Sequence, residues 1–520
     1  MKLVLLVLMC STLILAIDDQ KPTEKAATEK STEATKATSV VTSENTSKDD
    51  EKAKTETSNT TESEICKKCN CAIEEKTIYC DDLSIEKMFT EDQFVEFNKT
   101  KVPQDIFRIN NNELTEINAF PILSIKVLVL RRNKISKIAK GAFYNLTLLE
   151  ELDLSWNDLS SKVLIPEIFE GHYSPTVYEP LEMLKTLRLN NNQLHALHPD
   201  VFEHFPNLEV LSLHSNPIMA IDHLTSVAIS NIPNLKFLDL SYLELTEVPK
   251  HLFVSPRELH TLNLTGNLLT SVPEALQFAV NLETLYLDEN NIEHIDKGNY
   301  VFPKMDKLEF LSISYTTLKS IGSGAFSQLS ELKTLMLTNN PHLSSIHESA
   351  LSRKGKENPR QIEYPPLTNL YLHNNNLSTL DANLFPRYDN LDVVDLRHNP
   401  WVCDCENQWM ISNLLPIIIK KHPTMSKDLH CNQPHALVGK EMSELLNSKL
   451  RCSDKYDNMP QQDGTILVGI LIGILIGIPL ALAVVFVYKR GCFGLASNRG
   501  AAAYSRAFYK RAEAGDDFHI

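Results

Sequence analysis

One phrase, L-x-x-L-x-L-x-x-N-x-L with conservative replacements, recurs twelve times along the chain. Clear copies begin at Leu149, Leu184, Leu282 and Leu332. A unit of about 24 residues cannot bury its apolar face alone, so successive units must stack on one another. The chain therefore forms an elongated array with a long open surface. The asparagine position of the phrase falls at 112, 133, 157, 192, 216, 243, 267, 290, 316, 340, 375 and 399.

The letters of the phrase predict its local structure. Two leucines spaced by two point inward from one short strand, and parallel strands of successive units form a sheet on the concave face. The asparagine turns inward, where its amide bonds to backbone groups of adjacent turns. Leu243 and Thr316 replace it in two units, so we expect local irregularity near the sixth unit. The Phe of Gly141–Phe143 and of Gly324–Phe326 should pack under the convex side.

The first 64 residues predict export followed by a spacer. Residues 1–16 combine an early Lys, an apolar run and a small residue, which is typical of a secretory signal peptide. Residues 17–64 are rich in Thr, Ser, Glu and Lys and hold no aromatic residue, so they should be disordered. Asn45 and Asn59 lie there in acceptor sequences for N-glycosylation. A glycosylated spacer and an uncommitted tail both fit this segment.

The cysteines that remain outside the signal peptide fall in two sets of four and one single residue, Cys492. In an exported chain each set predicts two disulfides, one pair at each end of the array, although three connectivities are open within a set. Two zinc sites are the competing interpretation. The two sets are Cys66, Cys69, Cys71 and Cys80 before the repeats, and Cys403, Cys405, Cys431 and Cys452 after them.

These sets resemble the caps of a known family. The spacing C-x2-C-x-C-x8-C over 66–80 resembles the N-terminal cap of extracellular leucine-rich-repeat proteins, and NPWVCDC at 399–405 resembles their C-terminal cap. Similar proteins include tartan-like and connectin-like adhesion molecules and the Toll ectodomain. The resemblance implies an α/β solenoid with a curved parallel sheet on the concave face and an irregular or short-helical convex face. It also implies the disulfides Cys66–Cys71, Cys69–Cys80, Cys403–Cys431 and Cys405–Cys452.

The predicted organisation has eight parts. Successive asparagine positions are 35 residues apart at two places, 157 to 192 and 340 to 375, so these two repeats carry insertions. The insertions suit contact surfaces or are tolerated loops without a role. The parts are the signal peptide 1–16, the spacer 17–64, the N-terminal cap 65–95, the repeats 96–399 with insertions near 160–180 and 347–366, the C-terminal cap 400–453, a linker 454–464, a membrane helix 465–488 and a tail 489–520.

Residues 465–488 contain no charge over 24 positions, which is long enough to span a bilayer as a helix. The basic residues that follow predict a type I single-pass protein of the plasma membrane with the repeats outside. Three features of this region predict contacts or modification, each with a neutral alternative. Gly469, Gly473 and Gly477 share one helix face and suit homodimerisation; Cys492 suits palmitoylation; Phe518 and Ile520 suit a cytosolic PDZ partner.

A candidate recognition surface lies on the concave face of repeats 8 to 11. Aromatic residues and Met gather there, and such residues are enriched at the energetic centres of interfaces. Phe310 and Tyr315 are expected on the strand between those of Tyr286 and Met336. The members of the surface are Tyr286, Phe310, Tyr315, Met336 and Tyr371. Asn263, in the middle of a strand, is an acceptor whose glycan would block part of this face; further acceptors are Asn98, Asn145 and Asn376.

Composition and motifs narrow the function. A formal net charge of −15 without a basic cluster in the repeats argues against nucleic-acid binding. No complete metal, nucleophile or phosphate-binding motif occurs, so neither an enzyme nor a cofactor is expected. We therefore expect a cell-surface adhesion or recognition protein that binds an extracellular protein. The alternatives are an immune or developmental receptor acting with a co-receptor, and an accessory subunit of another membrane protein.

Overall fold

The computed structural model describes residues 63–170, 172–174, 177–296, 301–355, 358, 360–452 and 460–490. Several predicted features lie outside these residues. They are the signal peptide, the spacer with Asn45 and Asn59, the palmitoylation candidate Cys492, and the C-terminal residues Phe518 and Ile520.

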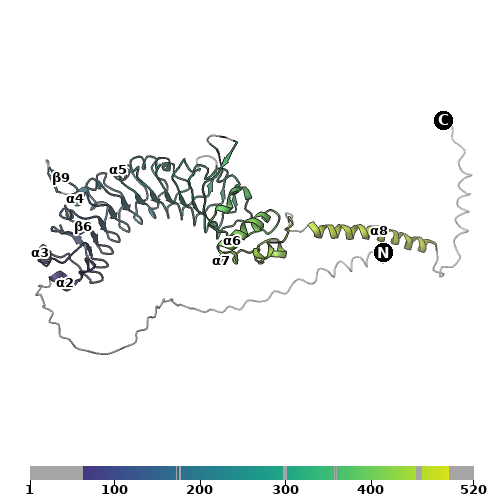
Figure 1. Cartoon of the computed structure of the whole chain (residues 1–520), viewed down its shortest axis with the longest axis horizontal. Helices are drawn as coiled ribbons and strands as arrows, with labels where there is room; N and C mark the ends of the chain where they lie inside the picture. The colour runs from purple at the N-terminus through teal and green to yellow at the C-terminus, as the bar shows by residue number, and fades with distance from the viewer. Residues whose placement is uncertain are drawn as a thin grey trace, which may run out of the picture. The chain divides into compact units, whose positions relative to one another are not determined.

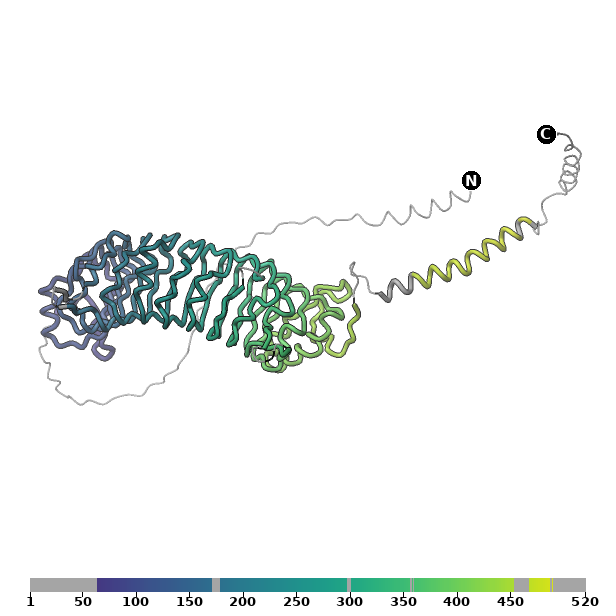
Figure 2. The backbone as a smooth tube through the Cα atoms, turned by 90° about the horizontal axis from the view of Figure 1, so that it is seen from above, coloured from purple at the N-terminus to yellow at the C-terminus, as the bar shows by residue number. Residues whose placement is uncertain are grey.

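Each repeat forms one coil, and the coils stack side by side into an arc (Figures 1 and 2). Every coil contributes a three-residue strand to one 14-stranded sheet, in which β1 and β2 are antiparallel and the later strands are parallel and in chain order. The strands are β1 (Asn70–Ala72), β2 (Thr77–Tyr79), β3 (Ile106–Arg108), β5 (Val127–Val129), β7 (Glu151–Asp153), β10 (Thr186–Arg188), β11 (Val210–Ser212), β12 (Phe237–Asp239), β13 (Thr261–Asn263), β14 (Thr284–Tyr286), β16 (Phe310–Ser312), β18 (Thr334–Met336), β22 (Asn369–Tyr371) and β23 (Val393–Asp395).

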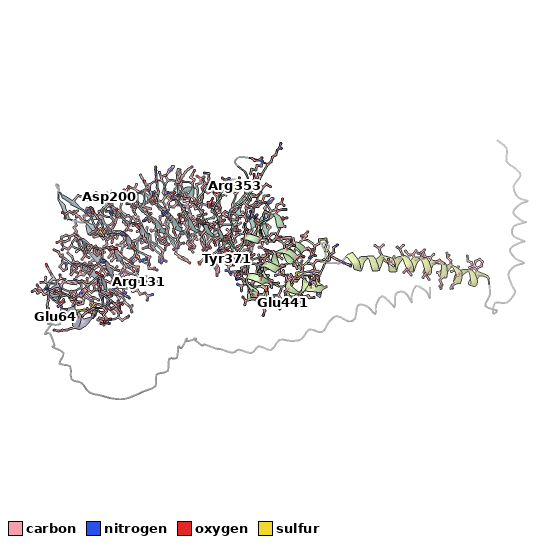
Figure 3. The ribbon with its side chains drawn as sticks, viewed as in Figure 1. Glu64, Arg131, Asp200, Arg353, Tyr371 and Glu441 are labelled. Carbon is pink, nitrogen blue, oxygen red and sulfur yellow. A yellow bond between two sulfur atoms is a disulfide. The ribbon has the colours of Figure 1, made fainter. Side chains whose placement is uncertain are left out.

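The sheet lies on the inner side of the arc, as the predicted solenoid requires. Arg131 and Tyr371, which follow or end strands of the sheet, lie on the inner side, whereas Asp200 and Arg353 lie on the outer side (Figure 3). The outer side is mostly irregular and holds two small parallel sheets. These are β4 (Glu116–Ile117) with β6 (Lys137–Ile138), and β15 (His294–Ile295) with β17 (Ser320–Ile321) and β19 (Ser345–Ile346). The predicted fold class is confirmed.

Short helices occupy the ends and a few coils. The α-helices are α2 (Glu64–Lys68), α3 (Glu91–Lys99), α4 (Pro166–Phe169), α5 (His223–Ser230), α6 (Leu415–Lys421), α7 (Pro423–Ser426) and α8 (Pro460–Arg490). The 3-10 turns are η1 (Glu274–Phe278), η2 (Ala382–Leu384), η3 (Tyr388–Asn390), η5 (His435–Leu437) and η6 (Met442–Leu445), and η4 (Met410–Leu414) is a π-helical turn.

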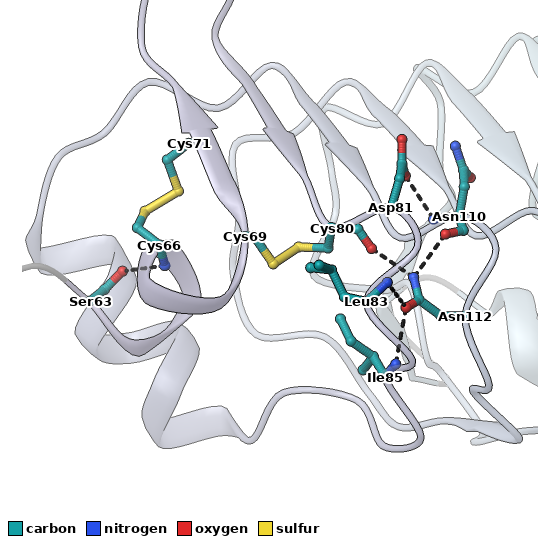
Figure 4. Close-up of a disulfide and its surroundings, with 10 residues drawn as sticks. All are labelled: Ser63, Cys66, Cys69, Cys71, Cys80, Asp81, Leu83, Ile85, Asn110 and Asn112. Atoms are coloured by element: carbon teal, nitrogen blue, oxygen red, sulfur yellow. Dashed lines mark hydrogen bonds between the residues drawn. A yellow bond between two sulfur atoms is a disulfide. The ribbon is translucent and has the colours of Figure 1, made fainter.

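The asparagine ladder holds the coils together as predicted. Asn112 Oδ1 accepts from the backbone N–H of Leu83 and of Ile85, both at 3.0 Å, and its Nδ2 donates to the Cys80 carbonyl at 2.6 Å (Figure 4). Asn290 repeats this arrangement near the other end of the sheet. These bonds give backbone groups of successive turns their hydrogen-bond partners inside the solenoid.

The irregularity expected near the sixth repeat lies in the adjacent turn of the fifth. Leu243 is fully buried and offers no side-chain oxygen. The Ile218 N–H therefore donates to the Asn216 carbonyl of its own coil at 2.8 Å, and Met219 takes a positive φ of 57°. The strands β11, β12 and β13 keep a regular register, so the defect is confined to the turn.

Phenylalanines form a stack beneath the outer side, as predicted for Phe143 and Phe326. The rings of Phe120 and Phe143 are 6.2 Å apart, and those of Phe143 and Phe169 are 5.9 Å apart. Phe326 pairs with Phe302 at 5.8 Å. Each ring fills the space between neighbouring coils, which supplies packing along the array rather than within one coil.

Disulfides close both ends of the array. Cys66 pairs with Cys71, and Cys69 pairs with Cys80, where the chain enters the sheet (Figure 4). At the other end Cys403 pairs with Cys431 and Cys405 with Cys452. These are the pairs that the family resemblance implied. The buried Trp401 donates from Nε1 to the Leu396 carbonyl at 2.9 Å, which joins the C-terminal cap to the last strand.

Candidate recognition surface on the inner sheet

The register of the sheet sorts its exposed side chains into rows. In each strand the central residue is buried, and the residues before and after it face the open side of the sheet. The row formed by the last strand residues runs Tyr286, Ser312, Met336, Tyr371 and Asp395 across five neighbouring strands. The predicted members Tyr286, Met336 and Tyr371 therefore lie on one row.

Phe310 belongs to the other row but contacts the first. It is in register with Thr284, and its ring lies 5.2 Å from that of Tyr286 at an interplanar angle of 50°. Both rings are partly exposed on the inner side. The pair forms a rigid apolar platform, because two packed aromatic rings lose little side-chain freedom on binding.

Tyr315 does not lie on a strand, contrary to the sequence interpretation. β16 ends at Ser312, and Tyr315 follows in the turn with φ 58° and 62% of its surface exposed. The residue before each ladder position has this left-handed conformation, which turns the backbone inward after every strand. We call these twelve residues the turn row: Asn111, Arg132, Trp156, Asn191, Ser215, Tyr242, Gly266, Glu289, Tyr315, Asn339, Asn374 and His398.

The turn row supplies residues that sequence reasoning missed. Trp156 and Tyr242 are exposed aromatics of this row, like Tyr315. The signal was present in the sequence, since each directly precedes a ladder position. It was overlooked because the sequence interpretation took the open surface from strand residues that flank the inward leucines and did not consider the turns.

A hydrogen-bonded group of polar residues lies beside the aromatic residues, and we call it the polar floor: Asp288, Ser312, Ser314 and Thr338. Asp288 Oδ1 accepts from the Ser312 hydroxyl at 2.5 Å and from the Ser314 N–H at 2.6 Å. Burial raises the pKa of the Asp288 carboxyl even though these bonds act in the opposite direction. The Thr338 hydroxyl continues the chain by donating to the Ser314 oxygen at 3.1 Å. Because these groups satisfy one another, the floor is preorganised rather than free to follow a ligand.

His373 borders the surface on the side of the C-terminal cap. Its Nδ1 is buried without a hydrogen-bond partner among the described residues and lies 3.9 Å from the Asp395 carboxylate. Burial lowers the pKa of His373, and Arg397 and His398 lower it further, while Asp395 acts against them. Arg397 makes two bonds to Asp395, at 2.8 and 2.9 Å. Burial alone would raise the pKa of Asp395, but the bonds from Arg397 hold it below its ordinary value.

The glycosylation acceptors differ in their surroundings. Asn263 is half-buried on β13 and in register with Tyr286, so a glycan there would reach the aromatic pair. Asn145 donates from Nδ2 to the Phe120 carbonyl at 2.8 Å, and Asn98 donates to the Ile122 carbonyl at 3.0 Å. Asn376 is exposed.

Both insertions project from the outer side, away from the candidate surface (Figure 1). The first holds the hairpin β8 (His172–Ser174) and β9 (Val177–Glu179), and the second holds β20 (Arg353–Lys354) and β21 (Ile362–Glu363). A tyrosine ties each to the next coil. The Tyr178 hydroxyl donates to the Glu203 carbonyl at 2.8 Å, and that of Tyr364 donates to the Asn383 carbonyl at 3.2 Å.

Helix α8 includes one apolar stretch, Leu467–Phe486, that is long enough to cross a membrane. Gly469, Gly473 and Gly477 lie within it, and none has a neighbouring atom within 4 Å of where a Cβ would stand. Pairing through these glycines therefore stays a prediction.

Comparison with known proteins identifies the repeats. The family model described as "Leucine rich repeat" matches residues 105–159, 182–244, 233–292 and 280–342, all within the stacked coils. The matched residues of the coils are thus similar to leucine-rich repeats.

Three individual proteins that are similar to this chain share at most 27% of its residues over the matched region. Mouse podocan is 27% identical over 357 residues, which cover 61% of this chain and 56% of podocan. The mouse CD180 antigen is 26% identical over 65% of this chain and 44% of its own length. The chain spans about half the length of these curated relatives. The solved Toll–Spätzle complex of Drosophila is similar over 69% of this chain and 56% of that chain, with 20% identity and a TM-score of 0.43.

Proposed function

We propose that this leucine-rich-repeat protein is a cell-surface recognition protein whose inner sheet binds an extracellular protein. The observation that carries the proposal is the surface formed by Tyr286, Phe310, Tyr315, Met336 and Tyr371. Exposed aromatic and Met side chains on a rigid sheet offer a large contact area at a small entropic cost.

The setting of this surface supports a role outside the cell. Four disulfides close the ends of the array, and disulfides persist in oxidising compartments. Leu467–Phe486 supplies a membrane anchor in the type I orientation, with the short tail in the cytosol. The repeat family is one of stacked units with extended binding surfaces, which favours recognition over catalysis.

The experiment is a binding screen with the full-length protein displayed on cells, against a panel of purified extracellular proteins. A true partner should bind wild-type cells and lose about tenfold or more in affinity with Tyr286→Ala/Tyr371→Ala, since truncating an aromatic residue at the energetic centre of an interface costs about 2 kcal/mol or more. Surface expression measured with an epitope tag corrects for folding defects.

A matched control places the same truncation on the other side of the arc. Tyr178→Ala removes an exposed tyrosine from the outer insertion. Binding that survives the inner double variant but falls with Tyr178→Ala would contradict the proposal and move the contact to the insertion.

Adhesion and ligand reception remain as two forms of this function. Cells expressing the protein should aggregate without added ligand if recognition is homophilic. If they stay single while a panel protein binds, the protein is a receptor or co-receptor instead.

A further inference from the structure

Two arginines at the end of β5 lack an acidic partner. Arg108 on β3, which adjoins β5, pairs with Asp81 at 2.9 Å, and Arg188 on β10, two strands from β5, pairs with Glu151 at 3.1 Å. Arg131 and Arg132 form no ion pair within the described part of the chain. In a chain with net charge −15, two positive charges next to each other in the sequence therefore remain without an acidic partner.

Arg131 also has a hydrogen-bond donor that no other described residue satisfies. Its Nε is buried without a hydrogen-bond partner among the described residues, although the side chain lies on the inner side of the arc (Figure 3). A buried donor left unsatisfied is costly, and a guanidinium is best satisfied by an anion. The protein therefore leaves part of the hydrogen-bonding capacity of this guanidinium unused, and an acceptor on a partner would pair with its accessible nitrogens.

Trp156 stands beside the arginines in the turn row. The Arg132 guanidinium lies 5.4 Å from the centre of its indole, and 43% of Trp156 is exposed. Trp156 has φ 57°, a conformation that bulky residues rarely adopt and that Asn or Gly adopts more easily. The backbone at this position therefore favours Asn or Gly over Trp, and the exposed ring calls for another explanation.

The surrounding charges decide which anion fits. Glu151 lies on β7, which adjoins β5, and Asp81 follows β2, two strands from β5 on the other side, so a long sulfated polysaccharide that crosses these strands would meet carboxylates as well as guanidinium groups. A single carboxylate avoids them. An apolar residue next to the acidic one would also cover the Trp156 indole, while the carboxylate accepts two charge-assisted hydrogen bonds from a guanidinium group.

We propose that Arg131, Arg132 and Trp156 form a second contact site, which binds one acidic side chain of a protein partner together with an adjoining apolar residue. The site lies on repeats 2 and 3. Six strand spacings separate β5 from β14, or roughly 30 Å, so it is distinct from the aromatic surface around Tyr286. Its test does not depend on the aromatic surface.

The test selects a random dodecapeptide library on the full-length protein in lipid nanodiscs. Peptides enriched on wild type should contain Asp or Glu next to a large apolar residue. Individual peptides should bind Arg131→Gln/Arg132→Gln about tenfold more weakly. Arg257→Gln/Arg360→Gln removes the same charge from two exposed arginines elsewhere and should bind as wild type does.

A second variant separates binding from folding. Trp156→Asn places a residue suited to positive φ in the turn row, so its melting temperature should equal or exceed that of wild type. Its peptide affinity should still fall about threefold or more because the stacked guanidinium loses its ring.

Three results would overturn the proposal. The first is a selection without acidic residues, and the second is unchanged peptide binding in Trp156→Asn or in the arginine double variant. The third is retention on a heparin column that depends on both arginines while no peptide is enriched, which would assign the site to a polysaccharide.

Discussion

The ring of Tyr242 lies over Gly266 of the next coil, where a Cβ would stand 2.2 Å from the Tyr242 Cδ1. Beyond the glycine, the Tyr242 hydroxyl donates to Glu289 Oε1 at 3.0 Å. The bond thus links repeats 6 and 8 across repeat 7. Gly266 is the one glycine of the turn row, and the space that Tyr242 needs explains it.

This relationship predicts that Gly266→Ala destabilises the protein by about 1–3 kcal/mol, from the displaced ring and the positive φ together. In the background of Tyr242→Ala, Gly266→Ala should cost only the contribution from the positive φ, about 1 kcal/mol. Chemical denaturation of the four proteins of this cycle measures the coupling. Equal costs in the two backgrounds would show that the ring does not press on this position.

The ladder predicts very different effects at two adjacent asparagines. Asn290 is buried; its Oδ1 accepts from the Leu269 N–H and its Nδ2 donates to the carbonyls of Leu264 and Leu287. Asn290→Ala should therefore cost about 2–4 kcal/mol. Asn291 is exposed, and Asn291→Ala should change stability by less than about 0.5 kcal/mol. Similar midpoints of denaturation for both variants would argue against the ladder as a source of stability.

A glycan on Asn263 should shield Tyr286, because the two residues are paired in register on adjacent strands. Asn263→Gln should then raise the rate at which hydroxyl radicals modify Tyr286 in the full-length protein. Tyr371, three strands further on, should react as before and serves as the internal control. Glycopeptide mapping that finds Asn263 unmodified would remove the basis of this prediction.

His373 should make the fold sensitive to mild acid. Its pKa is lowered in the folded protein, so the unfolded chain takes up a proton more readily as pH falls below about 6.5. Stability is therefore complete above that pH and decreases as pH falls toward the folded-state pKa. His373→Gln should reduce the drop in melting temperature between pH 7.5 and 5.5. His435→Gln, a histidine of the C-terminal cap, is the control; an equal drop in all three proteins would exclude His373 as the cause.

Much of the fold could be predicted because its determinants are periodic. The leucines of each phrase became buried strand centres, and Asn112 and Asn290 became ladder residues. The effect of Leu243 was placed correctly to within one turn, since a missing amide leaves the preceding coil without its acceptor. Tyr315 was misplaced because the strands are only three residues long, and the turn begins earlier than the phrase suggests.

The candidate surface was harder to predict, since its contacts join residues that are distant along the chain. Tyr286 and Phe310 were both expected on the inner face, but their ring contact depends on the register between β14 and β16. The insertions were open to either interpretation, and the structure places them on the outer side. Nothing in their length or composition fixes the side of the coil from which they leave.

The sequence by itself determined the stacked repeats, the closed ends and the long apolar helix, because period, cysteine spacing and hydrophobic length are local properties of the chain. Only the tertiary structure decided that Trp156 lies under Arg132, that Arg131 lacks a partner, and that Tyr242 covers Gly266. These contacts arise between coils, where stacking brings together residues one repeat apart. The repeated phrase specifies the coil, whereas the residues between its leucines acquire their neighbours only when the coils pack.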